Sequence, residues 1–209
     1  MTADEVLKQV ADKTDVCTKC ELHHSRKNAV PGEGPADADI LFIGEGPGFH
    51  ENEQGRPFVG AAGRFLEELL EKVGMSREQV YITNVVKCRP PGNRDPRPEE
   101  IETCTSDYLD RQIQAINPKV IVTLGRFSMG QYLPNAKISD VHGQPLHVKG
   151  RLVVPMYHPA AALHQGSLRS VIESDFAKLP DLISQAADVP EYSENPPEEK
   201  QDPKQLSLF

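Results

Sequence analysis

The chain contains no tryptophan and few other aromatic residues, and it has no apolar run long enough to cross a membrane. It also lacks a secretory signal peptide, so we expect a cytoplasmic protein without membrane contacts. Its 209 residues suggest one domain and a tail, and we expect a monomer. The net charge of −8 argues weakly against a protein that binds nucleic acid.

The negative charge is unevenly distributed. Six acidic residues and only two lysines fall within residues 188–204, which therefore carry half of the net charge. This segment is rich in proline and poor in large apolar side chains, as disordered segments are. We expect a folded domain over residues 1–186 and a disordered acidic tail over 187–209. The domain can still present a local basic face, for which the candidates are Lys87, Arg89, Arg94 and Arg97.

Cysteine is scarce, and its four positions are Cys17, Cys20, Cys88 and Cys104. A cytosolic chain rarely keeps structural disulfides, so metal or redox use is favoured. The spacing matches neither a zinc ribbon nor the compact bacterial ferredoxin pattern. Four thiolates suit tetrahedral zinc or an iron–sulfur cluster, and the spacing leaves both open. Buried free thiols remain an alternative for the downstream pair.

The stretch that organises the chain is residues 41–63. An apolar run ends abruptly in the loop Gly44–Gly48, and acidic side chains and Phe58 follow. Ligands of open α/β sheets bind beyond the carboxyl ends of the strands, where this loop would lie. A glycine-rich turn can also bind a dinucleotide, but the spacing is G-x-G-x-G and the next helix begins only near Gly63.

Apolar runs and helical patterns alternate along the chain. The expected strands are residues 40–43, 80–86, 120–124 and 152–156, the last entered through a hairpin near Lys149–Gly150. The expected helices are residues 2–12, 63–73, 98–116, 125–133 and 168–182. This alternation predicts a three-layer α/β/α sandwich around a central, mainly parallel, four-stranded sheet.

Three polar residues fall at the carboxyl ends of expected strands: Glu45, Asn84 and His158. Asn84 can donate to and accept from the amide edge of a ligand, or it can bond neighbouring backbone. His158 stands directly before Pro159 and is placed for a site, although a structural histidine is the alternative. Together with Phe58 they predict a binding site at one rim of the sheet.

Four ordered motifs resemble family 4 uracil-DNA glycosylases over about residues 5–182. They are GEGPG (Gly44–Gly48), GRPFVGAAG (Gly55–Gly63), TNVVKCRPPGNRDP (Thr83–Pro96) and YHPAA (Tyr157–Ala161). The resemblance implies an enzyme that flips uracil out of DNA and hydrolyses its glycosidic bond, starting base excision repair. It also implies a structural 4Fe–4S cluster on the four cysteines.

The resemblance further implies roles for single residues. Phe58 would stack on uracil, Asn84 would read its amide edge, and His158 would donate to the uracil oxygen where negative charge develops. Glu45 and Gly46 would form the pocket wall. Glu45 or Glu51 would position water or stabilise the cationic sugar, and the sequence does not decide between them.

Contacts with DNA are expected from two further segments. Arg89, Arg94 and Arg97 either meet phosphates or remain solvated. Leu163 or His164 would wedge into the gap left by the flipped base. The segment between Lys87 and Cys104 lacks the inserted histidine-bearing loop of relatives that trap uracil-DNA covalently, so we expect turnover.

The last five residues, QLSLF, resemble the peptide by which bacterial proteins dock on the replication sliding clamp. Leu206, Leu208 and Phe209 would fill an apolar groove and Gln205 would bond at its rim; alternatively, the end packs on its own domain. Two other classes of function remain: an inactive iron–sulfur adaptor that binds DNA and the clamp, and an electron-transfer protein. The site residues argue against the first, and the lack of a second cofactor motif argues against the second.

Overall fold

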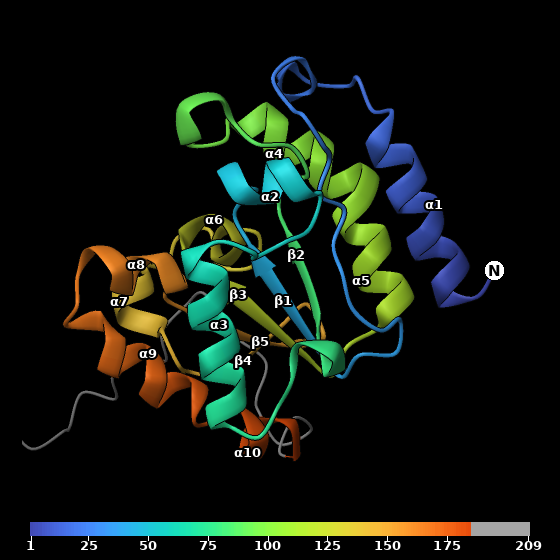
Figure 1. The fold of residues 1–209 in the computed structure, drawn as a ribbon. Helices are drawn as coiled ribbons and strands as arrows, with labels where there is room; N and C mark the ends of the chain where they lie inside the picture. Colours follow the sequence, from blue (N-terminus) through green and yellow to red (C-terminus); the bar gives the residue numbers. More distant parts are fainter. Residues whose placement is uncertain (185–209) are drawn as a thin grey trace, which may run out of the picture.

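The fold is a twisted sheet between two layers of helices (Figure 1). The computed structural model describes residues 1–184, so the expected acidic tail and the clamp-binding residues Gln205, Leu206, Leu208 and Phe209 lie outside the described residues. The sheet order is β2-β1-β3-β5-β4. The strands are β1 (Ile40–Gly44), β2 (Tyr81–Asn84), β3 (Val120–Leu124), β4 (Leu146–Val148) and β5 (Arg151–Met156).

The expected fold class is confirmed, with one strand more than expected. β1, β2, β3 and β5 are parallel, and their registers pair Leu41 with Tyr81 and with Ile121. The additional strand, β4, is the first arm of the expected hairpin and pairs antiparallel with β5 at the sheet edge. No helix among residues 1–184 is long and apolar enough to span a membrane.

Alternating strand residues feed two separate cores, as the pleat of a sheet requires. Leu41 and Ile43 pack into the core that α1 and α5 cover, whereas Ile40 and Phe42 pack into the core under α3 and α9. The longer helices are α1 (Ala3–Asp15), α3 (Ala61–Lys72), α4 (Pro98–Cys104), α5 (Asp110–Ile116) and α9 (Leu168–Phe176). The shorter ones are α2 (Phe49–Gln54), α6 (Arg126–Gly130), α7 (Ile138–Val141), α8 (Pro159–His164) and α10 (Leu179–Ser184).

Several elements differ from the sequence expectation. The strand expected over 80–86 ends at Asn84, where the chain turns. The Val85 N–H still donates to the Gly44 carbonyl (3.0 Å), just beyond the end of the strand. The helix expected over 98–116 contains a π-helical segment, Thr105–Leu109, directly after Cys104. The helix expected over 168–182 is divided into α9 and α10. The proline-rich loop between Cys88 and Pro98, which lies in none of the expected helices, contains a 3₁₀ turn, Pro91–Asn93.

Candidate active site

A cavity of about 470 Å³ opens at the carboxyl ends of β1, β2 and β5. The structure brings to its wall eight of the residues that the sequence singled out: Glu45, Gly46, Glu51, Phe58, Asn84, Arg94, His158 and His164. They come from the ends of the parallel strands and the loops and helices that follow them. This is the edge at which open α/β sheets bind their ligands.

The Phe58 ring forms one wall of the cavity and is almost completely buried. It stacks on the His158 ring, with centroids 5.4 Å apart and an interplanar angle of 24°. Gly44 makes this approach possible, because a Cβ there would lie 2.8 Å from Phe58 Cε2. Arg77 holds the loop in place by donating to the carbonyls of Pro57 and Phe58 (3.0 Å to the latter). Phe58 adopts a left-handed conformation (φ 51°), which these contacts stabilise.

Asn84 is the last residue of β2 and its side chain lines the cavity. The residue is 2% exposed, and its Oδ1 atom has no hydrogen-bond partner among residues 1–184. A buried acceptor without a partner costs free energy, so such atoms in native proteins usually have a ligand, water or functional explanation. Oδ1 can therefore accept a hydrogen bond from a ligand N–H group in the cavity.

His158 caps the N-terminus of α8 and faces Phe58. The Ala160 backbone N–H donates to His158 Nδ1 (3.1 Å), so in the neutral ring Nε2 carries the proton and can donate. Burial lowers the pKa of His158 to about 4, and Glu51 opposes this effect. The ring is therefore neutral near pH 7. Gly125 (φ 91°) lets β3 end close to it, because a Cβ there would lie 3.2 Å from His158 Cβ.

The two candidate carboxylates have different surroundings. Glu51 Oε1 accepts hydrogen bonds from the backbone N–H groups of Val59 (2.9 Å) and Gly60 (3.0 Å), which ties α2 to the Phe58 loop. The Glu45 carboxylate makes no hydrogen bond within residues 1–184, and burial raises its pKa, helped by Asp95. Glu51 is thus the fixed carboxylate and Glu45 the less restrained one.

Of the expected DNA-contact residues, Arg94 and His164 line the cavity. Arg97 is exposed, whereas Arg94 lines the cavity wall and forms a bidentate ion pair with buried Glu100 (2.7 and 2.9 Å). Arg89 donates to Asn93 Oδ1 (2.8 Å) and lies over the Phe49 ring, with its guanidinium carbon 5.4 Å from the centroid.

Two exposed residues stand at the end of α8. Leu163 is 50% exposed, an unusual position for a large apolar side chain, and His164 is exposed beside it on the cavity wall. Lys87, in contrast, was wrongly assigned to a basic face. Its side chain is fully buried, because it folds back over the end of β2 instead of reaching solvent.

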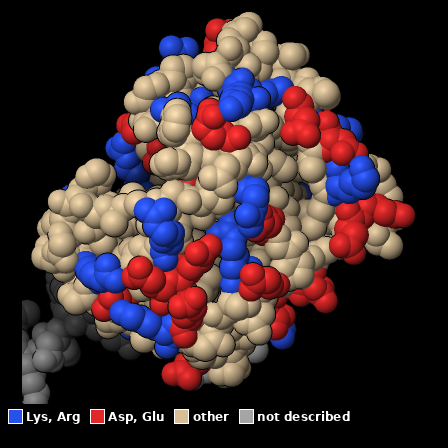
Figure 2. Space-filling model, in the orientation of Figure 1, with Lys and Arg blue, Asp and Glu red and all other residues tan. Residues whose placement is uncertain are grey.

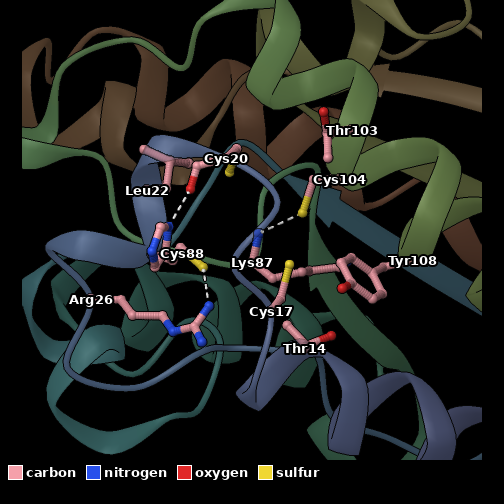
Figure 3. Close-up of a pocket in the computed structure, with 11 residues that line it drawn as sticks. Thr14, Cys17, Cys20, Leu22, Arg26, Lys87, Cys88, Thr103, Cys104 and Tyr108 are labelled. Carbon is pink, nitrogen blue, oxygen red and sulfur yellow. Dashed lines mark hydrogen bonds between the residues drawn. The ribbon is translucent and has the colours of Figure 1, made fainter.

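The four cysteines line a second cavity, between α1, the loop after β2 and α4 (Figure 3). The Arg26 guanidinium donates to Cys88 Sγ (3.4 Å), and the Lys87 backbone N–H donates to Cys104 Sγ (3.3 Å). Such N–H···S bonds tune the potential of iron–sulfur clusters. Burial raises the pKa of the Cys104 thiol to about 12, so an electropositive ligand is needed to hold this sulfur as a thiolate.

No group of three His, Cys, Asp or Glu side chains among residues 1–184 is placed to hold a single metal ion. The four sulfurs instead surround a shared space, to which they come from separate segments (Figure 3). The lining holds four thiols and the imidazole of His23, whose Nδ1 lies 2.7 Å from the Cys20 carbonyl, and four thiols are a donor set that iron–sulfur clusters use. The residues present therefore fit a cluster in their chemistry.

Sequence reasoning missed two residues that the structure places at these sites and misplaced a third. Arg77 clamps the Phe58 loop, and Asn93 lines the cavity and holds Arg89. Lys87, which the sequence analysis placed on a basic face, instead lines the cysteine cavity. Asn93 has a left-handed backbone (φ 54°) inside a Gly-Asn turn, a signal that could have been recognised. Arg77 and Lys87 carry no local signal, because their partners are distant in sequence or lie behind them on the strand.

The molecular surface is mixed in charge (Figure 2). Over α3 and α9, acidic and basic side chains lie side by side and form ion pairs such as Lys72–Glu173 (2.8 Å) and Arg169–Glu68 (2.7 Å). Pairs of this kind at the surface contribute little to stability. On this face of the molecule the basic side chains are largely neutralised by neighbours.

Comparisons with known proteins agree with the geometry. Residues 31–178 match the uracil DNA glycosylase superfamily. The chain is 48% identical over 188 residues to the type-4 uracil-DNA glycosylase of Sulfurisphaera tokodaii, with 84% of each chain covered. It is 48% identical over 189 residues to that of Archaeoglobus fulgidus, covering 86% of this chain and 92% of the relative. The corresponding protein of Thermotoga maritima is 45% identical over 187 residues, covering 87% and 97%.

Proposed function

The chain belongs to the uracil DNA glycosylase superfamily and to its type-4 family, and from this we propose that it excises uracil from DNA. It is a hydrolase that cleaves the N-glycosidic bond, leaves an abasic site and so starts base excision repair. The observation that carries this function is that Asn84 Oδ1, which has no hydrogen-bond partner among residues 1–184, lines the same cavity as His158, whose Nε2 carries the proton. Uracil presents an N–H donor next to two carbonyl acceptors, which is the pattern that these groups complement.

The proposed roles follow from the geometry. The flipped uracil stacks on Phe58, Asn84 Oδ1 accepts from the uracil N3–H, and His158 Nε2–H donates to O2. When the bond between N1 and C1′ breaks, the electron pair leaves with uracil and the sugar becomes cationic. A fixed donor at O2 stabilises the developing anion. Water then adds its hydroxyl to C1′, and its proton is released or taken up by the departing base.

A single assay tests the function. The purified protein is incubated with an oligonucleotide that contains one uracil and with a thymine control, and both are treated with hot alkali. We expect cleavage at uracil only. Absence of cleavage by cluster-loaded protein would overturn the function and favour a DNA-binding adaptor. A denaturant-resistant adduct would contradict the expected turnover.

We assign the stabilisation of the cationic sugar to Glu51 instead of Glu45, because two backbone N–H groups fix its carboxylate. The Glu51→Gln variant keeps an oxygen that can accept both bonds and loses only the charge. We expect its kcat to fall roughly 10²-fold, with KM nearly unchanged, since the charge acts in the transition state. Glu45→Gln, the matched control, should lose less than about tenfold. The reverse order of the two effects would assign the role to Glu45.

We propose that the four cysteines hold a 4Fe–4S cluster, which supplies a rigid link between α1, the loop after β2 and α4. Cys17→Ser and Cys88→Ser should each lower bound iron and sulfide, and the visible absorbance of the cluster should decrease with them. Both variants should also melt at a lower temperature, because the link contributes to folding. Elemental analysis gives the decisive measurement, and one zinc ion per chain in the wild type would overturn this assignment.

At the rim, Arg89 and Arg97 are proposed to contact phosphates, and Leu163 is proposed to fill the gap left by uracil. The support is that Arg97 and Leu163 are exposed and that the half-buried Arg89 donates to Asn93, which lines the cavity. Arg94 is also proposed to contact a phosphate, with its guanidinium oriented by Glu100.

The C-terminal peptide is proposed to dock on a bacterial sliding clamp, on the strength of its sequence alone. Deleting Gln205–Phe209 should abolish binding to the clamp and change excision from short oligonucleotides by less than about twofold, because the site lies in residues 1–184. Surface plasmon resonance against immobilised clamp measures the first effect, and a tail with the same five residues scrambled is the control. Lost activity on short oligonucleotides would instead indicate that the end packs on its own domain.

A further inference from the structure

Lys87 is a fully buried lysine that lines the cysteine cavity. Its Nζ atom donates to the Asn84 carbonyl (2.7 Å) and to Thr83 Oγ1 (2.7 Å), both of which are neutral acceptors. None of the ion pairs within residues 1–184 includes Lys87. A buried ammonium group is costly unless an anion compensates it.

The cysteines provide that anion when they act as ligands. Lys87 lines the same cavity as Cys17, Cys20, Cys88 and Cys104, and its backbone N–H donates to Cys104 Sγ (3.3 Å). Figure 3 shows Lys87 among the labelled cysteines, with the bond from its backbone nitrogen to Cys104 Sγ drawn as a dashed line. Four thiolates around a cluster carry a net negative charge, so Lys87 stands where a counter-charge is needed.

The same ammonium group also bonds the end of the strand that carries Asn84. Asn84 ends β2, and its carbonyl receives the Lys87 ammonium while its side chain lines the uracil cavity. Thr83 Oγ1, the other acceptor, is anchored independently by donating to the Pro31 carbonyl (2.8 Å). Loss of the ammonium would therefore leave the Asn84 carbonyl, more than Thr83, without support.

We propose that Lys87 is a positioning residue that couples the two sites: it is the buried counter-charge of the cysteine-bound cluster, and it fixes the strand end that presents Asn84 to uracil. This inference rests on the proposed cluster and the proposed glycosylase function. It assigns the cluster a second effect besides linking segments, because the charge that holds Lys87 in place also sets the position of the uracil-reading amide.

Two variants separate the charge from the hydrogen bond. Lys87→Met removes both, and Lys87→Gln removes the charge but keeps an N–H donor. Lys119→Met is the matched control, because Lys119 is an exposed lysine whose ion pair with Asp39 (2.9 Å) lies at the surface. All three variants are purified, and the iron content, sulfide content and visible absorbance of each are measured.

The first readout is the reduction potential of the cluster, measured without DNA. A nearby cation stabilises the reduced, more negative cluster, so both Lys87 variants should shift the potential to more negative values and Lys119→Met should not. The second readout is inhibition by free uracil together with kcat/KM. Lys87→Met should raise the inhibition constant of uracil and lower kcat/KM, each by roughly 10–100-fold, the range seen when groups that orient a ligand are lost. Lys87→Gln should recover part of both losses.

An unchanged potential in Lys87→Met would overturn the counter-charge, and unchanged uracil inhibition would overturn the positioning of Asn84. If Lys87→Met does not fold, hydrogen exchange on the wild type provides the test. Removal of the iron should accelerate amide exchange in residues 83–88, while residues 120–124 of β3 stay protected. If iron removal changes the exchange of the two segments equally, the coupling is overturned. Failure of the glycosylase assay would leave the potential shift intact, so the two failures are distinguishable.

Discussion

Replacing Asn84 with leucine should lower kcat/KM for uracil excision by roughly 10²–10³-fold. Leucine is close to asparagine in shape, so the cavity wall is kept while both hydrogen-bonding groups are lost. Besides the proposed bond from uracil N3–H to Oδ1, the Asn84 amide N–H can donate to the neighbouring uracil carbonyl. Two such bonds are worth about 3–4 kcal/mol together, and each 1.4 kcal/mol is tenfold. The free energy of unfolding should rise or stay constant, because the variant removes an acceptor that has no protein partner within residues 1–184.

The matched control is Thr123→Val on β3. Thr123 Oγ1 is also buried and without a partner among the described residues, but Thr123 does not line the uracil cavity. Its replacement should leave kcat/KM within about twofold, since the change lies away from the cavity. Steady-state kinetics and urea unfolding of both variants separate recognition from stability. A strong loss of stability with unchanged kcat/KM in Asn84→Leu would mean that Asn84 is a structural residue.

Three of the four parallel strands end within one residue of the position predicted from the sequence, whereas β2 ends two residues early. β3 has the expected bounds, and β1 is one residue longer than expected and ends at Gly44. Short continuous runs of β-branched and apolar residues are typical of strands that are buried on both faces. Parallel pairing then forces the residues after each run to one edge. Glu45, Asn84 and His158 converge there for that reason, although they are far apart in sequence.

The rest depends on tertiary contacts that no local pattern reveals. The π-helical segment after Cys104 has the same apolar spacing as a regular helix, and only its packing at the cysteine cavity distinguishes it. Likewise, α2 has a weak helical pattern and is fixed by Glu51 bonding the Phe58 loop. The sequence around Lys87 does not distinguish it from an exposed basic residue near a loop. Only the structure shows that its side chain folds back to the Asn84 carbonyl at the end of β2.

The spacing of the four cysteines along the chain also does not identify the metal group that they bind. Sequence alone left zinc and an iron–sulfur cluster open, because ligand spacing along a chain does not fix distances between sulfurs. In the fold, Cys88 lies four residues beyond the end of β2 and Cys104 at the end of α4, so the distances depend on how these elements pack. The family resemblance, not the spacing, supplied the cluster as an expectation.

The His158→Ala variant should lose about 3–4 kcal/mol of transition-state stabilisation, a fall in kcat of roughly 10²–10³-fold, because it removes the side chain that we propose as the donor to the uracil oxygen. His158→Gln keeps an N–H donor and should recover part of this loss. Single-turnover kinetics on a uracil oligonucleotide measure both variants. Equal activity of wild type and His158→Ala would show that the charge on O2 is stabilised elsewhere.

The pH dependence tests whether the donor is neutral. With a pKa of about 4, His158 stays neutral from pH 8 down to about 5, so wild-type single-turnover rates should show no step near 6.5 from this group. An increase in rate as the pH falls towards 4 would instead identify the imidazolium as the donor.

The free energy of unfolding should also depend on the protonation of His158. Because an unfolded histidine has a pKa of about 6.5, the unfolded chain binds more protons between pH 6.5 and 4. The contribution of His158 is therefore complete above pH 6.5 and is lost as the pH falls through 4, and His158→Gln should flatten this slope in urea unfolding.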